Sequence, residues 1–197
     1  ESDDNVRAIK IFSESGILID SAEAINPRDV VETSSNEIWE SDFWDGLVKL
    51  SNRKNKELIR PNGIFSNATY NLAIQNNDLY AIAGGENGWI YTYNGDGFSK
   101  YSNGNWTTFN RTVGTSSMDT ILDVMDVVVD PRNNYIYAAT FQSGLLELHP
   151  HNTSVVYKNT PYIQAQIGDN SYRLAGLVMD SEHNLWMSNY GAPDQLV

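Results

Sequence analysis

The sequence predicts an all-β protein built from short antiparallel strands, and three observations support this prediction. Runs rich in β-branched and aromatic residues alternate with clusters of Asn, Gly, Asp and Pro, which is the pattern of strands joined by turns. No segment keeps a helical apolar period for long enough to form a core helix. A strand–turn–strand pattern also recurs along the chain, as it does in repeat architectures.

The recurring pattern is a polar, Asn-bearing turn followed by an aliphatic–aromatic pair. The pairs are Ile38-Trp39, Leu79-Tyr80, Ile136-Tyr137 and Leu185-Trp186. An apolar segment precedes each turn, as at 127–129. In the first three copies a glycine opens the next apolar segment, at Gly46, Gly88 and Gly144. A further strand usually follows, so each copy predicts four antiparallel strands.

Four strands per copy, with copies about 40–60 residues apart, are the dimensions of a β-propeller blade. The segment before each turn is small and aliphatic, as the crowded innermost strand of a blade requires. The aromatic residue of the second strand is expected to fill the wedge between neighbouring blades. The fold class we expect is therefore an all-β β-propeller, with three complete four-stranded blades and two partial ones.

The expected parts follow one another along a single propeller domain. They are the outer half of a preceding blade at 1–26, complete blades at 27–61, 62–110 and 111–160, and a partial blade at 161–197. We expect the whole to be a fragment of a larger propeller. The alternative is that the two partial blades combine and close a four-bladed ring. Closure matters because an open array leaves apolar blade faces in water and favours self-association.

Composition excludes several classes of function. The chain has 197 residues, with 13 basic and 25 acidic side chains and a net charge of −12, so a nucleic-acid partner is not expected. The absence of cysteine excludes disulfides, zinc–thiolate sites and a thiol nucleophile. No apolar run of about 18 residues is present, so no membrane span is expected in this window.

The motifs that resemble catalytic or metal sites have simpler interpretations. His149, His151 and His183 lie where the repeat places turns, so we interpret them as turn residues. The Gly-rich run 83–88 lacks the Lys and Ser/Thr of a phosphate-binding loop. The segment 93–98 has hairpin dipeptides rather than the ligand ladder of a calcium loop. We expect no catalytic residue, no metal and no cofactor.

Binding has a better positional argument. The long connections follow fourth strands or join second to third strands, and in a propeller both kinds of loop emerge on one face. Aromatic and amide side chains on that face suit sugars or peptides, because they combine a stacking plane with oriented hydrogen bonds. The alternative for each aromatic residue is packing beneath its own loop. The candidate ligand-binding residues are Phe43, Trp44, Phe65, Phe141, Gln142, Tyr162, Asn189 and Tyr190.

The stretches NLWMSNYG, NYIYAATFQSGLLEL and YSNGNWTTFN resemble propeller repeats of Bacteroidetes proteins. Two groups carry such repeats: the PorZ-like component of the type IX secretion system, and periplasmic sensor regions of hybrid two-component regulators. The resemblance covers about 28–197, and the PorZ-like match is the closer one. The fourth copy departs from the pattern, with Ala192-Pro193-Asp194 where a Gly-Leu start is typical.

The resemblance implies an extracytoplasmic propeller, periplasmic or on the bacterial cell surface, that binds glycans or protein partners. Envelope lipopolysaccharide is the ligand class associated with PorZ-like proteins. We therefore expect a non-enzymatic binding or scaffold domain of an envelope protein. The alternative is a propeller lyase or hydrolase acting on a polysaccharide or a lactone, and a purely structural role in assembly is a third hypothesis.

Overall fold

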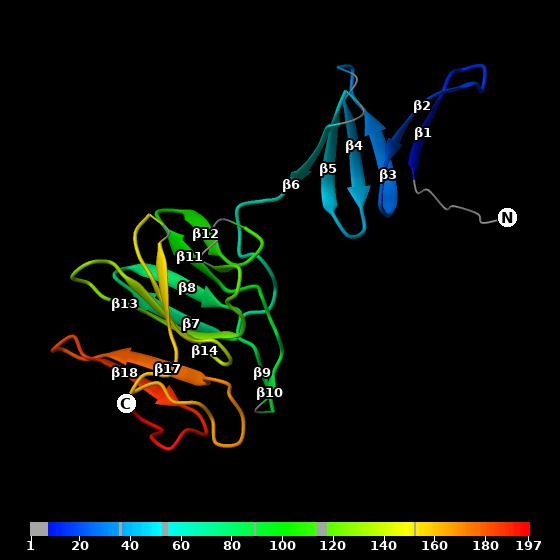
Figure 1. The fold of residues 1–197 in the computed structure, drawn as a ribbon. Coiled ribbons are helices and arrows are strands. Elements are labelled where there is room, and N and C mark those ends of the chain that lie inside the picture. The colour runs from blue at the N-terminus through cyan, green and yellow to red at the C-terminus, as the bar shows by residue number, and fades with distance from the viewer. Residues whose placement is uncertain (1–7, 36, 53–54, 89, 114–117, 152) are drawn as a thin grey trace. The chain divides into compact units, whose positions relative to one another are not determined.

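The computed structural model describes residues 8–35, 37–52, 55–88, 90–113, 118–151 and 153–197. Within these residues every regular element is a β-strand, apart from single-turn geometry, so the all-β prediction is confirmed. A helix long and apolar enough to cross a membrane is not found among them. The chain divides into two compact units, Glu1–Pro61 and Asn62–Val197, which are described separately (Figure 1).

The first unit holds a hairpin and one complete blade. The hairpin pairs β1 (Ala8–Phe12) with β2 (Leu18–Glu23). Blade 1 has the strand order β3 (Pro27–Glu32), β4 (Ile38–Asp42), β5 (Gly46–Ser51) and β6 (Asn55–Ile59), all antiparallel. A small core joins the two parts, because Ala22 of the hairpin clusters with Ile38, Val48 and Leu50 of blade 1.

The second unit holds two complete blades and a hairpin. Blade 2 comprises β7 (Asn71–Gln75), β8 (Asp78–Ile82), β11 (Phe98–Ser102) and β12 (Asn105–Phe109). Blade 3 comprises β13 (Val124–Val129), β14 (Ile136–Thr140), β15 (Gly144–Leu148) and β16 (Ser154–Tyr157). The last hairpin pairs β17 (Leu174–Met179) with β18 (Leu185–Asn189). Four-stranded antiparallel blades are thus the building unit, as predicted.

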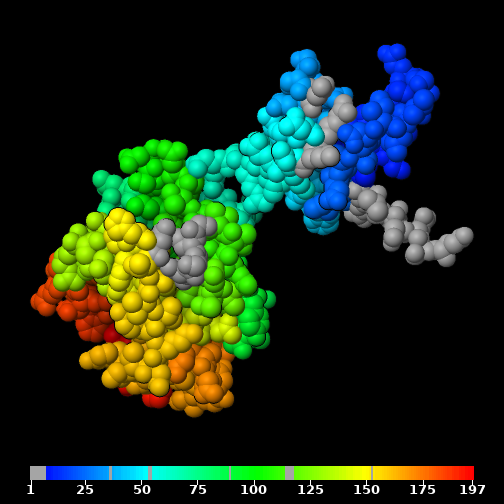
Figure 2. All heavy atoms as spheres, turned by 45° about the horizontal axis from the view of Figure 1, so that its top comes forward, coloured from blue at the N-terminus to red at the C-terminus, as the bar shows by residue number. Residues whose placement is uncertain are grey.

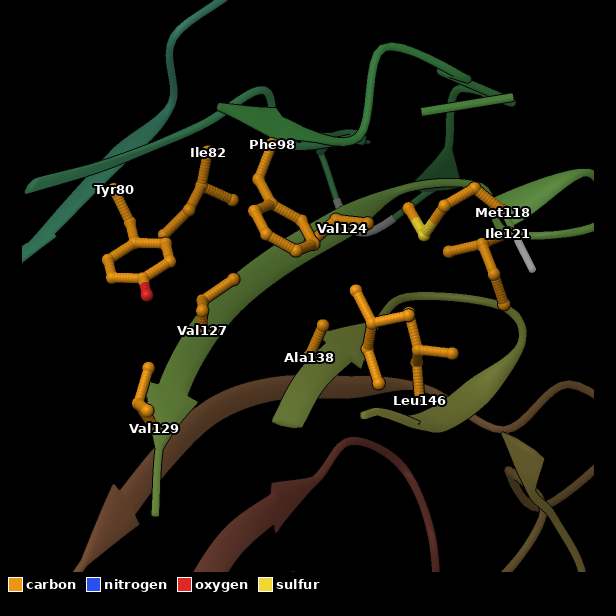
Figure 3. Packing of buried hydrophobic residues seen from close by; sticks show 11 residues of the cluster. Tyr80, Ile82, Phe98, Met118, Ile121, Val124, Val127, Val129, Ala138 and Leu146 are labelled. Atoms are coloured by element: carbon orange, nitrogen blue, oxygen red, sulfur yellow. The ribbon is translucent and has the colours of Figure 1, made fainter. Parts of the chain in front are cut away.

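The largest core lies between blades 2 and 3. Figure 3 shows Tyr80, Ile82 and Phe98 of blade 2 together with residues of blade 3 such as Ala138 and Leu146. A second cluster, which includes Leu145 and Leu174, lies between blade 3 and the last hairpin, with Tyr137 packed against it. The expected wedge role of the second-strand aromatic is confirmed for Tyr80 and Tyr137.

Trp186 differs from these two aromatics. Its side chain lies on the side of the hairpin that has no following blade among the described residues, and it is 43% exposed. The indole Nε1 donates a hydrogen bond to Asp180 Oδ2 at 2.9 Å. Among the described residues, the turn that precedes its strand therefore holds Trp186 at the surface.

The third strand of blade 2 differs from the prediction. It does not begin at Gly88, which lies between the two short strands β9 (Glu86–Asn87) and β10 (Ile90–Tyr91). It begins after Gly97, whose φ of +61° favours glycine. A Cβ on Gly97 would lie 2.1 Å from the Phe109 carbonyl oxygen, as one on Gly144 would lie 2.3 Å from that of Tyr157. Gly97 is thus the counterpart of Gly144.

As a result, residues 83–97 form an insertion between the second and third strands of blade 2, which we call the blade-2 insertion. Figure 1 shows β9 and β10 as a small ribbon beyond the end of the blade-2 sheet. The expected hairpin at 93–98 is not formed, because this segment connects β10 to β11 and those two strands do not pair.

The ring alternative is not observed. Residues 195–197 run beside β18, where Met187 and Val197 exchange backbone hydrogen bonds of 2.7 and 3.1 Å, and Asn189 N donates to Gln195 O at 2.8 Å. The third position of this sheet is therefore occupied by the segment that follows β18. Strands β1–β2 and β17–β18 form separate two-stranded sheets.

Candidate binding site

A cavity of about 450 Å³ lies in the second unit where loops of successive blades meet. Every residue around it comes from a connection between second and third strands or from one that follows a fourth strand. This is the loop-rich face that the sequence predicts. The lining residues are Tyr91, Thr120, Leu122, Gln142, Ser143, Lys158, Asp169, Asn170, Ser171 and Tyr172.

The lining suits a polar ligand with ring faces. Tyr91 and Tyr172 offer aromatic planes, while the amides of Gln142 and Asn170 offer both donors and acceptors. Hydroxyl groups and the Lys158 side chain complete the set. The volume lies within the range of about 300–1,000 Å³ that small-molecule sites have. Figure 2 shows the yellow and orange segments that contribute several of these residues packed together on the surface of this unit.

Arg173 holds the loops around the cavity together. Its guanidinium carbon lies 5.1 Å from the ring centroid of Tyr91 and 5.4 Å from that of Phe141. Its Nη2 donates to Asp169 Oδ2 at 2.9 Å, and its Nε donates to Ser171 Oγ at 2.8 Å. The buried Arg173 side chain therefore joins the blade-2 insertion, the β14–β15 turn and the loop before β17.

The electrostatics favour an ionised Asp169. Hydrogen bonds from Ser171 and the neighbouring charge of Arg173 outweigh partial desolvation and lower the pKa of the Asp169 carboxyl. The carboxylate is thus already engaged by Ser171 and Arg173 at neutral pH. Lys158 remains as the exposed cation of the lining.

The turn that carries Gln142 is held by short-range hydrogen bonds. Thr140 Oγ1 donates to the Gly144 carbonyl and accepts from Ser143 N, each at 2.8 Å. Gly144 N donates to the Tyr172 carbonyl at 3.0 Å, which ties the turn to the loop before β17. These bonds place Gln142 and Tyr172 on the same cavity.

Four of the sequence-predicted residues gather at or beneath this cavity. Gln142 lines it. Phe141 is buried beneath Arg173 and contacts Tyr190, with ring centroids 5.5 Å apart. Asn189 is also buried, and its amide, oriented by hydrogen bonding, donates to Gln164 O at 3.1 Å and accepts from Gln164 N at 3.0 Å. For Phe141 the packing alternative describes the structure, and Asn189 is bound within the protein by Gln164.

The other four predicted residues lie elsewhere. Phe43 and Trp44 belong to the first unit, on the β4–β5 turn, and are 58% and 69% exposed. Phe65 is partly buried near Phe98 in the segment before β7. Tyr162 is exposed and borders a separate hollow of about 660 Å³ along the outer side of the last hairpin.

Several lining residues were missed, among them Tyr91, Lys158, Asn170 and Tyr172. The repeat pattern does not indicate Tyr91, because it opens the third strand of blade 2 at Gly88 and so places Tyr91 within that strand. The glycine of the Asp96-Gly97 pair, directly before the apolar start of a strand at Phe98, was the available signal. Tyr172 gave no signal, because only the fold brings it against the β14–β15 turn.

The histidines lie outside this cavity. His151 and His183 occupy turns with φ of +76° and +65°, as the turn interpretation requires. His149 Nε2 lies 2.5 Å from Glu147 Oε1, and its ring stacks on Tyr135 at 4.0 Å. Within the described ranges, no group of three or more His, Asp or Glu side chains has an arrangement that could hold a metal ion.

The fold was compared with known proteins. No family model and no curated protein matches the sequence. Among solved structures, the chain is similar to PorZ, a bacterial surface component of the type IX secretion system of Porphyromonas gingivalis, with a TM-score of 0.69 and 18% identity over 96% of this chain. It also matches the extracellular domain described as part of a hybrid two-component system of B. thetaiotaomicron, with a TM-score of 0.43 and 15% identity over 92% of this chain.

The chain spans about a quarter of the length of these proteins, 26% and 27% respectively. PorZ belongs to one of the two groups whose repeats the sequence resembles, and the resemblance to that group is confirmed at the level of the fold. At these identities the similarity to PorZ concerns the fold. The chain is therefore an all-β protein of four-stranded propeller blades, with a fold that PorZ shares.

Proposed function

We propose that the chain is a non-enzymatic recognition module of a bacterial envelope protein, and that it binds glycan in the cavity of the second unit. The observation that carries this proposal is the cavity itself, in which loops from successive blades present two tyrosine rings beside amide and hydroxyl groups. Sugars combine apolar ring faces with many hydroxyl groups, so they need this pairing of stacking planes and two-way hydrogen-bonding groups.

The shape of the site favours a small polar ligand over a protein surface. A cavity of about 450 Å³ encloses one or a few sugar rings. A stable protein interface instead buries about 1,200–2,000 Å² over a broad patch. The net charge of −12 opposes nucleic acid.

The envelope location is proposed from the shared fold. PorZ is described as a bacterial surface component, and its structure resembles this chain over 96% of the chain's length. A scaffold or sensor role at the periplasm or cell surface is consistent with that likeness. Recognition at equilibrium, without turnover, is the mechanism that we propose.

The test is binding of the purified chain to a glycan array and to immobilised lipopolysaccharide. The wild type is expected to bind a defined subset of glycans. Gln142→Ala and Asn170→Ala are each expected to weaken that binding about tenfold, because a lost hydrogen bond to a ligand is worth about 1 kcal/mol or more. Glu182→Ala, in the exposed turn before β18, is the matched control and is expected to bind as the wild type does.

Two outcomes contradict the proposal. The absence of any bound glycan or lipopolysaccharide would refute glycan recognition. Release of shortened or unsaturated sugar products by the wild type would refute the non-enzymatic mechanism and support the lyase or hydrolase alternative.

A further inference from the structure

The blade-2 insertion has an unusual anchor. In blade 3 the connection between the second and third strands is a short turn held by its own Thr140. In blade 2 the corresponding connection runs from 83 to 97 and carries Tyr91 to the cavity. Holding a long loop in one conformation costs conformational entropy, so contacts must offset that cost. The contacts that restrict this one come from another blade.

The anchor is Asp123, the residue directly before β13, and its side chain is 0% exposed. Asp123 Oδ1 accepts a hydrogen bond from Asn94 N at 2.7 Å and one from Thr92 Oγ1 at 3.2 Å. Asp123 Oδ2 accepts from Tyr93 N at 3.2 Å. Asp123 N donates to Asn94 O at 2.8 Å. One buried residue thus binds three consecutive residues of the insertion.

The insertion has a space that fits this carboxylate. Thr92 N donates to Gly85 O at 3.0 Å, which closes the base of the insertion. A Cβ on Gly85 would lie 2.2 Å from Asp123 Oδ1 and 2.4 Å from Asp123 Cα, so only glycine permits this approach. Asp123 itself has a φ of +55°, a conformation that L residues rarely adopt. The two segments therefore meet where one has a glycine without a Cβ and the other an aspartate with a positive φ.

Asp123 also connects the insertion to the rest of the cavity. Its carbonyl accepts a hydrogen bond from Phe141 N at 2.8 Å, at the start of the β14–β15 turn. Its neighbour Leu122 lines the cavity, as do Gln142 and Tyr91. The position of the Tyr91 ring relative to Gln142 is therefore set through Asp123.

From this geometry we infer that residues 90–95 are a recognition loop, that Tyr91 contacts the bound sugar ring, and that Asp123 is the residue that positions the loop. This inference rests on the proposed function of the cavity and deepens it. Tyr91 supplies a stacking plane whose orientation is fixed before the ligand arrives, since Arg173 lies against the ring on one side. Asp123 acts through Thr92, Tyr93 and Asn94 without touching the ligand.

The positioning role is tested by hydrogen exchange of single backbone amides in the whole chain. Asp123→Ala is expected to speed exchange of the Tyr93 and Asn94 amides at least tenfold more than exchange of the β14 and β15 amides, whose rates report the global stability of the unit. In Asp123→Asn the remaining oxygen still accepts from Asn94 N, so only the Tyr93 amide is expected to exchange faster. A purely global loss of stability would instead speed exchange of all these amides by the same factor.

Two further variants are a milder test, Thr92→Val, and a control, Asp119→Ala. Thr92→Val removes only the hydroxyl bond to Asp123 and lies at an exposed site, so this variant is expected to fold even if Asp123→Ala does not. It is expected to speed exchange of the Tyr93 and Asn94 amides a few-fold. Asp119 is an exposed aspartate of the same connecting loop, and Asp119→Ala is expected to leave all rates unchanged. Unchanged Tyr93 and Asn94 rates in both Asp123→Ala and Thr92→Val would overturn the positioning role.

The ligand-contact role is tested by saturation-transfer NMR with the methyl glycosides of glucose, galactose and mannose. Tyr91→Ala is expected to abolish transfer to the glycoside that the wild type binds, while Tyr91→Phe retains it because the ring remains. Asp123→Ala is expected to weaken binding about tenfold and Asp123→Asn about threefold or less. If Tyr91→Ala shows the same saturation transfer as the wild type, the role of residues 90–95 as a recognition loop is overturned. No transfer with the wild type would contradict the proposed function, whereas the exchange rates still decide the role of Asp123.

Discussion

Blades 1 and 2 stabilise the connection between their second and third strands in different ways. In both, a carboxylate binds the backbone N–H groups of the connection between the second and third strands. In blade 1 the carboxylate is Asp42, which accepts from Trp44 N and Asp45 N of this connection, and also from Asn26 N before β3, at 2.6–2.9 Å. In blade 2 it is Asp123, which is supplied by the strand boundary of blade 3.

The pKa values of the two carboxyl groups move in opposite directions. Burial alone would raise the pKa of Asp42, but the three backbone N–H groups outweigh burial and lower it to about 2. At Asp123 burial is the larger effect, and it raises the pKa despite the bonds from the insertion. The blade-1 turn is thus bound by a carboxylate of its own blade, whereas the insertion is bound by a carboxylate at the start of the next blade. A loop whose conformation is fixed by a neighbouring blade can hold its side chains in the arrangement that a binding site requires.

The largest expected effect comes from removing the long-range anchor. Asp123→Ala leaves backbone N–H groups of the insertion without a buried acceptor, so it is expected to lower the free energy of unfolding of the second unit by about 2–4 kcal/mol. Urea denaturation measures this change. Asp119→Ala is the control, with an expected change within about 0.5 kcal/mol. A loss below about 1 kcal/mol for Asp123→Ala would contradict the anchoring role.

The next expected effect is a difference in stability loss between alanine substitutions of two glycines that open third strands. Gly46 and Gly97 both have positive φ, at +76° and +61°. A Cβ on Gly46 meets open space, so Gly46→Ala is expected to cost only the backbone strain of about 1–2 kcal/mol. Gly97→Ala also places a Cβ 2.1 Å from a carbonyl oxygen and is expected to cost about 1 kcal/mol more. Equal losses in denaturation experiments would show that blade 2 relaxes as freely as blade 1.

A smaller effect of opposite sign is expected at Glu40 in blade 1. Its side chain is 1% exposed, and burial together with the neighbouring Asp42 carboxylate raises its pKa. Apolar residues occupy the matching positions of the other second strands, Ala81, Ala138 and Met187. Glu40→Met is expected to stabilise the first unit by about 1–3 kcal/mol, measured by thermal or urea unfolding. Destabilisation would mean that Glu40 has a role that its packing does not show.

The smallest expected effect is the pH dependence that separates the two carboxylates. The Asp42 pKa of about 2 lies below the unfolded value of about 3.9, so its stabilising contribution is complete above pH 3.9 and is lost as the pH falls toward 2. Asp123 has a raised pKa, so its ionisation lowers the stability of the second unit as the pH rises from 3.9 through its folded pKa.

Denaturation of the whole chain between pH 2 and 7 tests this contrast. In Asp42→Asn, the free energy of unfolding of the first unit is expected to fall less as the pH is lowered than it does in the wild type. In Asp123→Asn, the free energy of unfolding of the second unit is expected to lose its decrease with rising pH. If both substitutions change the pH dependence of stability in the same direction, the opposite pKa shifts of Asp42 and Asp123 would be contradicted.

The repeat made most of the blade architecture predictable, because strand and turn propensities are local. The pair Ile136-Tyr137, the preceding apolar run at 127–129 and Gly144 are found in the predicted strands of blade 3. Blade 2 was predicted less well, since both Gly88 and Gly97 precede an apolar run and local sequence does not say which run joins the sheet. Packing decides, because Phe98 fills the core beside Tyr80 while Ile90 is exposed.

The sequence by itself determined the four-stranded blades, their order and the face on which the long loops lie, because these depend on strand periodicity and connection length. Only the tertiary structure decided which side chains meet on that face. Phe141 is buried under Arg173, whereas Tyr91 reaches the cavity through an anchor at Asp123. Contacts between residues far apart in the chain follow from how blades pack on one another, and no local pattern encodes them.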